Sequence, residues 1–297
     1  MKIAHSITDL IGHTPLLELT NYEKDHELKA TVLGKLEFLN PAGSSKDRTA
    51  ASMIRDAAEK GELRPKSTVM EATSGDTGIA LAALGASKGY HVVLMMPDDT
   101  SEEQRARAEA YGAELVLTPA DKGMSGAAEQ TEAMHMFTSY SVIPGQFTNP
   151  ANPDAHYRTT GPEIWEDTDG KTDILVAGVG TGGTVAGTGR YLKEKNPNVK
   201  IVAVELKGNG TGMVPGNQFG APLDETIAVE DAVAFNACRE LAQRDGVLAG
   251  VTSGAAVWAA GELAKRSENQ GKTIVVILPD SGSRYVSTPV FRENRLF

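Results

Sequence analysis

The class of fold is decided by the stretch Val69-Met-Glu-Ala-Thr-Ser-Gly-Asp-Thr-Gly78, which passes from an apolar run through small hydroxylated residues into a helical sequence. Residues 68–72 are typical of a short buried strand, and the helix is expected to continue from Thr77 to Lys88. Backbone N–H groups and hydroxyls at such a helix start can bind a carboxylate or another anion. The stretch therefore predicts an α/β sheet with an anion-binding loop after one strand.

The same alternation of strands and helices extends along the chain on both sides of this stretch. Further strands are expected at 91–96, 114–118, 173–177, 200–205 and 272–278. Helical sequences separate them, at 47–60, 101–111, 124–137 and 185–195 among others. The alternation predicts parallel-rich twisted sheets flanked by helices, and its two successive series predict two lobes.

A second loop of the same kind contains more glycine. It lies in Ile174-Leu-Val-Ala-Gly-Val-Gly-Thr-Gly-Gly-Thr184, directly before a helical sequence. Its backbone can wrap a group as bulky as a phosphate, so the candidate phosphate ligands are Gly180, Thr181, Gly182, Gly183 and Thr184. Ligands of parallel sheets gather at the carboxyl ends of the strands, where both loops are expected.

A lysine lies at an expected helix start, within Asn40-Pro-Ala-Gly-Ser-Ser-Lys-Asp-Arg48. The Pro-Ala-Gly run predicts a sharp bend, and Ser44 or Ser45 can cap the helix that follows. Lys46 would then lie at the rim of a pocket, where a partly desolvated amine can act as a Schiff-base nucleophile; the alternative is a solvated lysine in a first helical turn. Together with two anion-binding loops, this lysine indicates a cofactor with a phosphate and an aldehyde, and pyridoxal 5'-phosphate fits that description.

Seven motifs along the chain resemble those of the cysteine synthases, which are the O-acetylserine sulfhydrylases of the fold-type II pyridoxal-phosphate enzymes. In chain order they are 40–48, 73–78, 146–153, 159–165, 180–184, 252–256 and 279–285. The resemblance extends from Ile11 to Phe291, nearly the whole chain. The first half is more similar to the B isozyme, whereas Leu278-Pro-Asp-Ser-Gly282 is more similar to the A isozyme.

This resemblance implies a fold like that of the β subunit of tryptophan synthase, in which an early segment joins the C-terminal lobe. It divides the chain into an N-terminal α/β lobe of residues 1–12 and 35–147 and a cofactor-binding lobe of residues 13–34 and 148–297. The family's roles also carry over to matching residues. Lys46 would bind the cofactor as an internal aldimine and then act as the base at Cα, and the 180–184 loop would hold the phosphate.

The resemblance also assigns a set of residues to the substrate. The α-carboxylate would be bound by Thr73, Ser74, Gly75, Thr77 and Gln146. A simpler interpretation, that the Thr-Ser pair only caps a helix, is compatible with this role.

Ser253 indicates the type of reaction. The resemblance places its hydroxyl at the pyridine nitrogen, and a neutral group cannot keep that nitrogen protonated as a carboxylate would. Such a ring is a poorer electron sink, so β-elimination and β-replacement are favoured over transamination. The alternative role for Ser253 is to be the N-cap of a helix expected at 255–265.

Two positions depart from the family pattern. Asp76 replaces the usual asparagine, whose amide donates to the cofactor's 3'-oxygen; a carboxylate donates only when protonated, so either Asp76 or that oxygen is expected to hold a proton. The segment 206–220 is glycine-rich where A-type enzymes carry a longer, histidine-containing one, and it is interpreted as a lid or specificity loop. The preferred leaving group and nucleophile are left open by these residues.

Composition restricts the setting of the protein. The chain has 297 residues, a formal net charge of −10 and one cysteine, Cys238. The charge disfavours nucleic acid as a partner, and the single cysteine, expected to be a buried structural thiol, excludes an intrachain disulfide. No apolar run reaches the ~20 residues that span a membrane, and no signal peptide is recognised. The histidines, including His13 and His156, lack metal-ligand spacing. A cytoplasmic enzyme without a metal is therefore expected.

The sequence predicts a pyridoxal-phosphate-dependent β-replacement that makes L-cysteine from O-acetyl-L-serine and sulfide through an aminoacrylate intermediate. Two alternatives stay open at this point. The first is a related β-lyase or synthase, such as a cysteine desulfhydrase, a cystathionine β-synthase type enzyme or a serine dehydratase, and the second is a noncatalytic binding protein. The resemblance also implies a homodimer, with serine acetyltransferase as a candidate partner.

Overall fold

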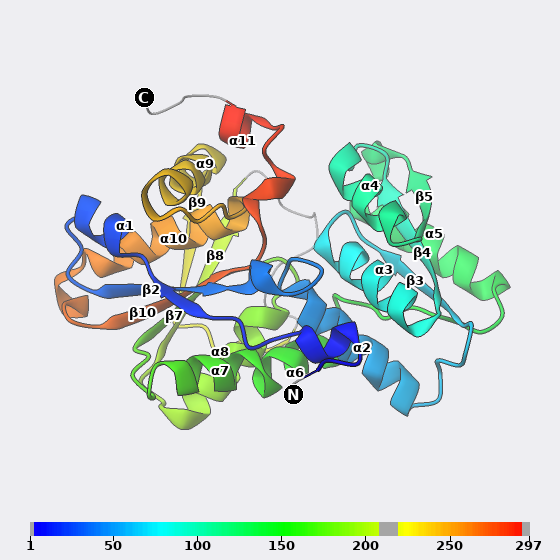
Figure 1. The fold of residues 1–297 in the computed structure, drawn as a ribbon, viewed down its shortest axis with the longest axis horizontal. Helices are drawn as coiled ribbons and strands as arrows, with labels where there is room; N and C mark the ends of the chain where they lie inside the picture. Colours follow the sequence, from blue (N-terminus) through cyan, green and yellow to red (C-terminus); the bar gives the residue numbers. More distant parts are fainter. Residues whose placement is uncertain (1–2, 208–218, 293–297) are drawn as a thin grey trace. The chain divides into compact units, whose positions relative to one another are not determined.

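The computed structural model describes residues 3–207 and 219–292, and these residues form two compact units (Figure 1). Unit 1 contains the N-terminal stretch up to Ile11 and Asn40–Asn152, and unit 2 contains Gly12–Leu39 and the described residues from Pro153 onward. The early segment in unit 2 is longer than the expected 13–34, and the second boundary falls after Asn152 where the sequence predicts 147. Most of the glycine-rich segment 206–220 lies outside the described residues.

Unit 1 is built on a four-stranded parallel sheet with the strand order β5-β4-β3-β6. Its strands are β3 (Thr68–Ala72), β4 (His91–Pro97), β5 (Glu114–Thr118) and β6 (Ser141–Val142). Its helices are η1 (Ile7–Leu10), α2 (Lys46–Glu59), α3 (Asp76–Lys88), α4 (Glu102–Ala110), η3 (Ala120–Lys122) and α5 (Gly123–Phe137). A helix follows each of the first three strands, as the sequence predicts.

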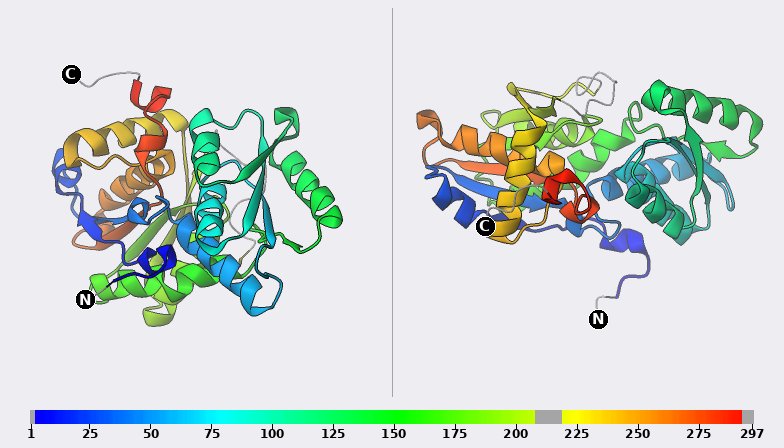
Figure 2. Two further views of the ribbon diagram at one scale, coloured as in Figure 1. Left: turned by 45° about the vertical axis from the view of Figure 1, so that its right-hand side comes forward. Right: turned by 90° about the horizontal axis from the view of Figure 1, so that it is seen from above.

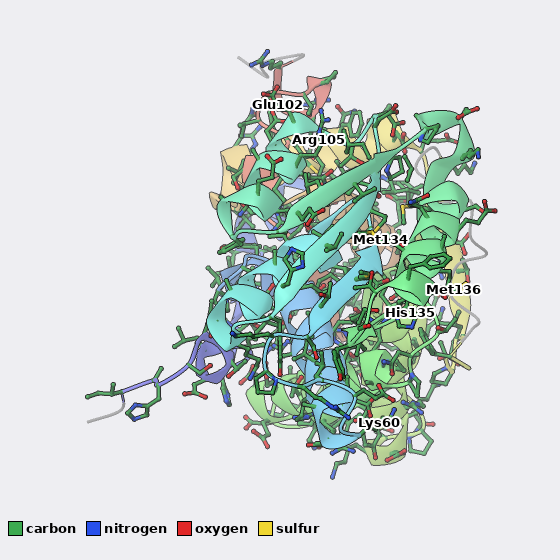
Figure 3. All side chains as sticks on the ribbon, turned by 90° about the vertical axis from the view of Figure 1, so that its right-hand side faces the viewer. Lys60, Glu102, Arg105, Met134, His135 and Met136 are labelled. Carbon is green, nitrogen blue, oxygen red and sulfur yellow. The ribbon has the colours of Figure 1, made fainter. Side chains whose placement is uncertain are left out.

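Alternate residues of the unit 1 strands serve two separate hydrophobic cores. Val69 packs with α2 and α3, whereas Met70 and Met95 pack with α5, and the left view of Figure 2 shows α3 and α5 on opposite sides of this sheet. On α5, Met134 packs against the second core, while Met136 is 77% exposed (Figure 3). Both faces of the sheet are therefore covered, which leaves the carboxyl ends of the strands to carry the loops that bind ligands.

Unit 2 is built on a six-stranded sheet with the order β1-β2-β10-β7-β8-β9, in which only the β1–β2 pair is antiparallel. Its strands are β1 (Leu16–Glu18), β2 (Thr31–Leu36), β7 (Ile174–Gly178), β8 (Lys200–Leu206), β9 (Glu225–Val229) and β10 (Thr273–Leu278). Its longer helices are α7 (Thr160–Asp167), α8 (Gly183–Lys195), α9 (Asp231–Glu240) and α10 (Val251–Ala264). Shorter ones are α1 (Thr20–Asp25), η2 (Glu37–Leu39), η4 (Leu241–Asp245), η5 (Ser267–Asn269), η6 (Gly282–Arg284) and α11 (Pro289–Arg292). The boundary between the units falls within α6 (Ala151–Arg158).

Helices also cover both faces of the unit 2 sheet. One core joins α9 and α10 to the sheet and the other joins α7 and α8, and Figure 1 shows these pairs on opposite faces. Cys238 lies in the first of these cores, the one with α9 and α10, and has no exposed surface. Its Sγ donates to the Gly250 carbonyl at 3.1 Å. Burial raises the pKa of the Cys238 thiol to about 12. The prediction of a buried structural thiol is confirmed.

Several helices begin earlier than the sequence predicts. Three of them follow a glycine N-cap directly, because Gly75, Gly182 and Gly250 adopt the cap backbone without a side-chain hydrogen bond. Consequently α10 begins at Val251, and Ser253 lies inside its first turn. The interpretation of Ser253 as an N-cap is therefore wrong. Within the part of the chain that the structure describes, no helix is both long and apolar enough to cross a membrane.

Candidate active site

Lys46 is the first residue of α2 and is half-buried. The Oγ of Ser44 accepts the Lys46 backbone N–H at 3.2 Å, and the Asp47 carboxylate accepts the Ala42 N–H at 2.6 Å, which closes the preceding bend. Of the two serines predicted as caps, Ser44 is thus the one that binds the helix start. Ser45 makes no side-chain cap, and its buried Oγ has no hydrogen-bond partner among the described residues. The amine-bearing residue is therefore held on a well-defined helix terminus.

The loop between β3 and α3 is organised around Thr73. Its Oγ1 accepts the N–H of Gly75 at 3.2 Å and that of Gly78 at 3.3 Å, so one buried hydroxyl satisfies donors on both sides of the helix start. Ser74, Gly75 and Asp76 are half-buried, and Asp76 is the first residue of α3. The loop therefore keeps a fixed shape at the carboxyl end of its strand.

Gln146 joins this loop from the segment after β6. Its Oε1 accepts the Thr77 hydroxyl at 2.5 Å, and its Nε2 donates to the Ala72 carbonyl at 3.1 Å. Thr77 and Gln146 are both buried, and they were predicted as ligands of the same carboxylate from positions 69 residues apart. Unit 1 thus brings together neutral donors suited to a carboxylate.

Two residues that the sequence analysis did not single out connect Gln146 to α2. Asn152 donates to the Gln146 carbonyl at 2.8 Å and accepts the Thr49 hydroxyl at 3.1 Å. Because Thr49 lies on the first turn of α2 after Lys46, the helix that carries the lysine is tied to the segment that carries the glutamine. Asn152 lies inside the 146–153 motif, which is the signal that could have found it.

A buried carboxylate supports the same segment from β3. The Oε2 of Glu71 accepts the N–H of Gly145 at 2.8 Å, and the backbone N–H of the next residue, Gln146, also acts on this carboxylate. Burial raises the pKa of Glu71 from 4.5 to about 7, and these two N–H groups lower it. Glu71 is therefore a titratable group in contact with the backbone of a predicted ligand.

Unit 2 contributes the glycine loop at the start of α8. Gly182, the N-cap, has φ +83°, and the Gly183 N–H donates to Thr181 Oγ1 at 3.3 Å. A Cβ on Gly180 would meet nothing within 4 Å, whereas one on Gly178 would lie 2.1 Å from the Thr252 side chain. The loop therefore offers open backbone to an anion, and it lies beside the start of α10.

His156, treated as structural from the sequence, contacts this loop. It has no exposed surface, its Nε2 lies 3.2 Å from Thr184 Oγ1, and its Nδ1 lies 2.9 Å from Thr160 Oγ1. The sequence gave no indication of this contact, because the histidines were considered only for metal-ligand spacing. His156 holds the hydroxyl of a predicted phosphate ligand in place.

Ser253 lies on the first turn of α10, next to Thr252. Its side chain has no exposed surface, and its Oγ has no hydrogen-bond partner among the described residues. A buried hydroxyl without a partner costs about 1–3 kcal/mol, so such a group calls for a ligand atom. The open glycine loop and this hydroxyl fit pyridoxal phosphate, which carries an anion and a ring nitrogen that accepts a hydrogen bond.

Comparison with known proteins extends these observations to the whole chain. The family described as "Pyridoxal-phosphate dependent enzyme" matches residues 7–280. A cysteine synthase of Staphylococcus aureus is 44% identical over 98% of each chain. The cysteine synthase structure from Entamoeba histolytica is 39% identical with a TM-score of 0.92, over 99% of this chain and 92% of that one. A hydrogen sulfide-producing enzyme from Fusobacterium nucleatum is 38% identical with a TM-score of 0.90, over 95% and 100%.

Proposed function

The chain belongs to the cysteine synthase family of pyridoxal-phosphate dependent enzymes, and we propose that it makes L-cysteine from O-acetyl-L-serine and sulfide by β-replacement. The reaction breaks the bond between Cβ and the acetate oxygen and forms a bond between Cβ and sulfur, so acetate leaves and the oxidation state of the amino acid is unchanged. The buried Ser253 hydroxyl, which has no partner among the described residues, is the observation that favours β-chemistry. Relatives named cysteine synthase and O-acetyl serine sulfhydrylase indicate the substrates.

We assign four groups of this chain to the cofactor. Lys46 would bind it covalently, the Gly180–Thr184 loop would hold its phosphate, Ser253 would donate to its ring nitrogen, and Asp76 would face its 3'-oxygen. When bound, pyridoxal phosphate supplies the electron sink that weakens bonds at the substrate Cα. Because Ser253 is neutral, it leaves that sink weak, which favours loss of a β-substituent over transfer of the amino group.

The substrate is held by neutral donors. We assign the α-carboxylate to the Thr73–Thr77 loop, with Ser74 and Gly75, and to Gln146. Thr73 fixes the loop backbone, and the Thr77 hydroxyl holds the Gln146 side chain in place before substrate arrives. A carboxylate bound there would fix one end of the substrate amino acid.

Lys46 has two successive tasks. Its amine would hold the cofactor when no substrate is bound, and in the presence of substrate the free amine would remove the Cα proton. The protonated amine would later return a proton to Cα. A lysine on the first turn of α2 suits both tasks, because its long side chain moves while the helix terminus stays fixed.

The experiment that tests this proposal is an assay of the purified protein loaded with pyridoxal phosphate. L-cysteine should form from O-acetyl-L-serine and sulfide, and pyridoxamine phosphate should not accumulate. A protein that stays colourless with the cofactor would overturn the proposal in favour of a binding protein. Pyridoxamine phosphate as the main product would contradict the role of Ser253.

A second candidate is a β-lyase that releases sulfide from cysteine, because a solved relative with 38% identity is named a hydrogen sulfide-producing enzyme. The same assay run with L-cysteine alone and with L-serine alone distinguishes the two. Faster release of sulfide from L-cysteine than synthesis from O-acetyl-L-serine would favour the lyase. The opposite order is expected.

We also propose that the enzyme is a cytoplasmic homodimer that can bind serine acetyltransferase, as the resemblance to the family implies. The single buried thiol is compatible with a reducing compartment. Analytical ultracentrifugation of the loaded protein should give twice the mass of the 31.4 kDa chain. Addition of the acetyltransferase should give a heavier complex, and a monomer that ignores the acetyltransferase would contradict both statements.

A further inference from the structure

Glu71 lies in β3 with 3% of its surface exposed, beneath the turn that carries Gln146. Its carboxylate accepts the backbone N–H of Gly145 at 2.8 Å, and the backbone N–H of Gln146 also lowers its pKa. Gly145 has φ +71°, a backbone conformation that glycine adopts readily. The carboxylate thus fixes the main chain of Gln146, while Thr77 and Ala72 fix its side chain.

The charge of Glu71 is not balanced by a cation within the described residues. The charged or titratable side chains on the elements packed against β3 are His91 on β4, Asp76 and Lys88 on α3, and Glu129, Glu132 and His135 on α5. The pKa of Glu71 is raised by burial and lowered only by the two N–H groups, without a contribution from these side chains. A buried carboxylate in this setting destabilises the fold when it ionises.

The sign of this effect follows from proton linkage. The folded pKa, about 7, lies above the ordinary 4.5, so the folded protein binds more protons than the unfolded chain between these values. Stability is therefore present at low pH and is lost as pH rises through about 7. Near neutral pH the chain keeps a carboxylate that weakens the fold, which indicates a role other than stability.

We propose that Glu71 is a positioning residue whose carboxylate holds the Gly145–Gln146 backbone so that Gln146, whose Oε1 accepts the Thr77 hydroxyl, presents its remaining amide N–H to the substrate carboxylate. The inference rests on the proposed function of this half-site, which is the Thr73–Thr77 loop and Gln146 of unit 1. The ionised form accepts the Gly145 N–H more strongly than the neutral acid does, because hydrogen bonds to a charged group are stronger. A protonated acid holds this N–H less firmly, so the turn loosens and substrate binding weakens as pH falls.

The test compares Glu71→Gln with the wild-type holoenzyme, because glutamine has nearly the same shape and resembles the protonated acid. At pH 8 the KM for O-acetyl-L-serine should rise about tenfold, the effect of losing one hydrogen bond to a charged group, with kcat little changed. The ratio of the two KM values should fall toward one below pH 6, where wild-type Glu71 is protonated. Meanwhile the melting temperature of Glu71→Gln relative to wild type should increase from pH 5 to pH 8.

Glu23→Gln is the matched control. The Glu23 carboxylate also accepts a backbone N–H, that of Val32 at 2.6 Å, and burial raises its pKa, but it lies in unit 2 outside the half-site. This variant should leave the KM unchanged at every pH. A KM increase in the control equal to that of Glu71→Gln would overturn the inference, since any loss of a bracing carboxylate would then suffice.

Two further outcomes separate this inference from the proposed function. If the wild type makes cysteine but Glu71→Gln has the wild-type KM at pH 8, the inference is wrong and the function stands. Hydrogen exchange at the Gly145 and Gln146 amides needs no substrate: exchange should be faster in Glu71→Gln, and in the wild type these amides should lose protection below pH 7 relative to the β4 amides. Unchanged exchange would overturn the inference even if the enzyme has another substrate.

Discussion

Two candidate binding regions, one in each unit, differ in how their polar groups find partners. In the loop of unit 1, the hydroxyls of Thr73 and Thr77 and the amide of Gln146 are already hydrogen-bonded within the protein. In unit 2, the Ser253 hydroxyl is buried without a partner in the described chain, and the Gly180 backbone borders open space. The unit 1 loop therefore holds its shape without a ligand, whereas in unit 2 the Ser253 hydroxyl is left for one.

This difference suggests a division of labour between substrate and cofactor. A substrate that arrives and leaves in every cycle is served by a pre-formed site, because ordering that site anew each time would reduce affinity. A cofactor that stays bound can supply hydrogen bonds that the polypeptide lacks. Its binding should therefore stabilise the protein by completing unit 2.

The largest expected effect comes from Lys46→Ala. This change removes both the covalent link to the cofactor and the base, so turnover should fall by about three orders of magnitude or more, as expected for loss of a nucleophile and a general base. The visible absorbance of the lysine-linked cofactor should also disappear. Borohydride followed by peptide mapping checks the assignment in the wild type, and a label on any other lysine would contradict it.

Gln146→Ala should have the next largest effect, and it should be confined to substrate binding. The change leaves the Thr77 hydroxyl without its acceptor and removes one proposed donor to the carboxylate, so KM should rise about tenfold to a hundredfold. Cofactor affinity, measured by titration of the apoprotein, should stay unchanged. A matching loss of cofactor affinity would show that substrate binding and cofactor binding are not separable in this way.

Ser253→Ala and Thr77→Val should change the stability of the apoprotein in opposite directions. Ser253→Ala removes a buried hydroxyl without a partner and should raise the free energy of unfolding by about 1 kcal/mol, whereas Thr77→Val strands the Gln146 oxygen and should lower it by about 1 kcal/mol. Denaturant unfolding of the apoproteins checks the signs. Addition of cofactor should stabilise Ser253→Ala less than the wild type, and a loss of apoprotein stability in Ser253→Ala would contradict the comparison.

The smallest effect is expected from Asp76→Asn, at the position where the chain departs from its family. Asparagine would restore a neutral donor to the cofactor's 3'-oxygen, so the pH dependence of the cofactor absorbance should become flatter, without unfolding of the protein. Spectra recorded between pH 5 and pH 9 measure this change. Superimposable titrations of the variant and wild type would mean that Asp76 makes no contact with the cofactor.

The alternation of strands and helices was predictable from sequence because buried parallel strands are short apolar runs, and β3 and β5 have the predicted limits. Helix starts were less predictable, since a glycine cap such as Gly250 leaves no side-chain signal. For this reason the alternative role of Ser253 as a cap is wrong, since Ser253 lies inside α10. The contacts of Glu71 with Gly145, Asn152 with Thr49 and His156 with Thr184 were not predictable, because each joins segments that only the fold brings together.

The buried thiol has a consequence for chemistry around the protein. Sulfide and free cysteine, the compounds of the proposed reaction, exchange with protein thiols and disulfides through the thiolate form. With a pKa of about 12, Cys238 is ionised to roughly one part in 10⁵ at pH 7. Its core position also denies access to a dissolved oxidant or persulfide. An enzyme working in a pool of reactive sulfur would thus keep its own thiol inert while folded.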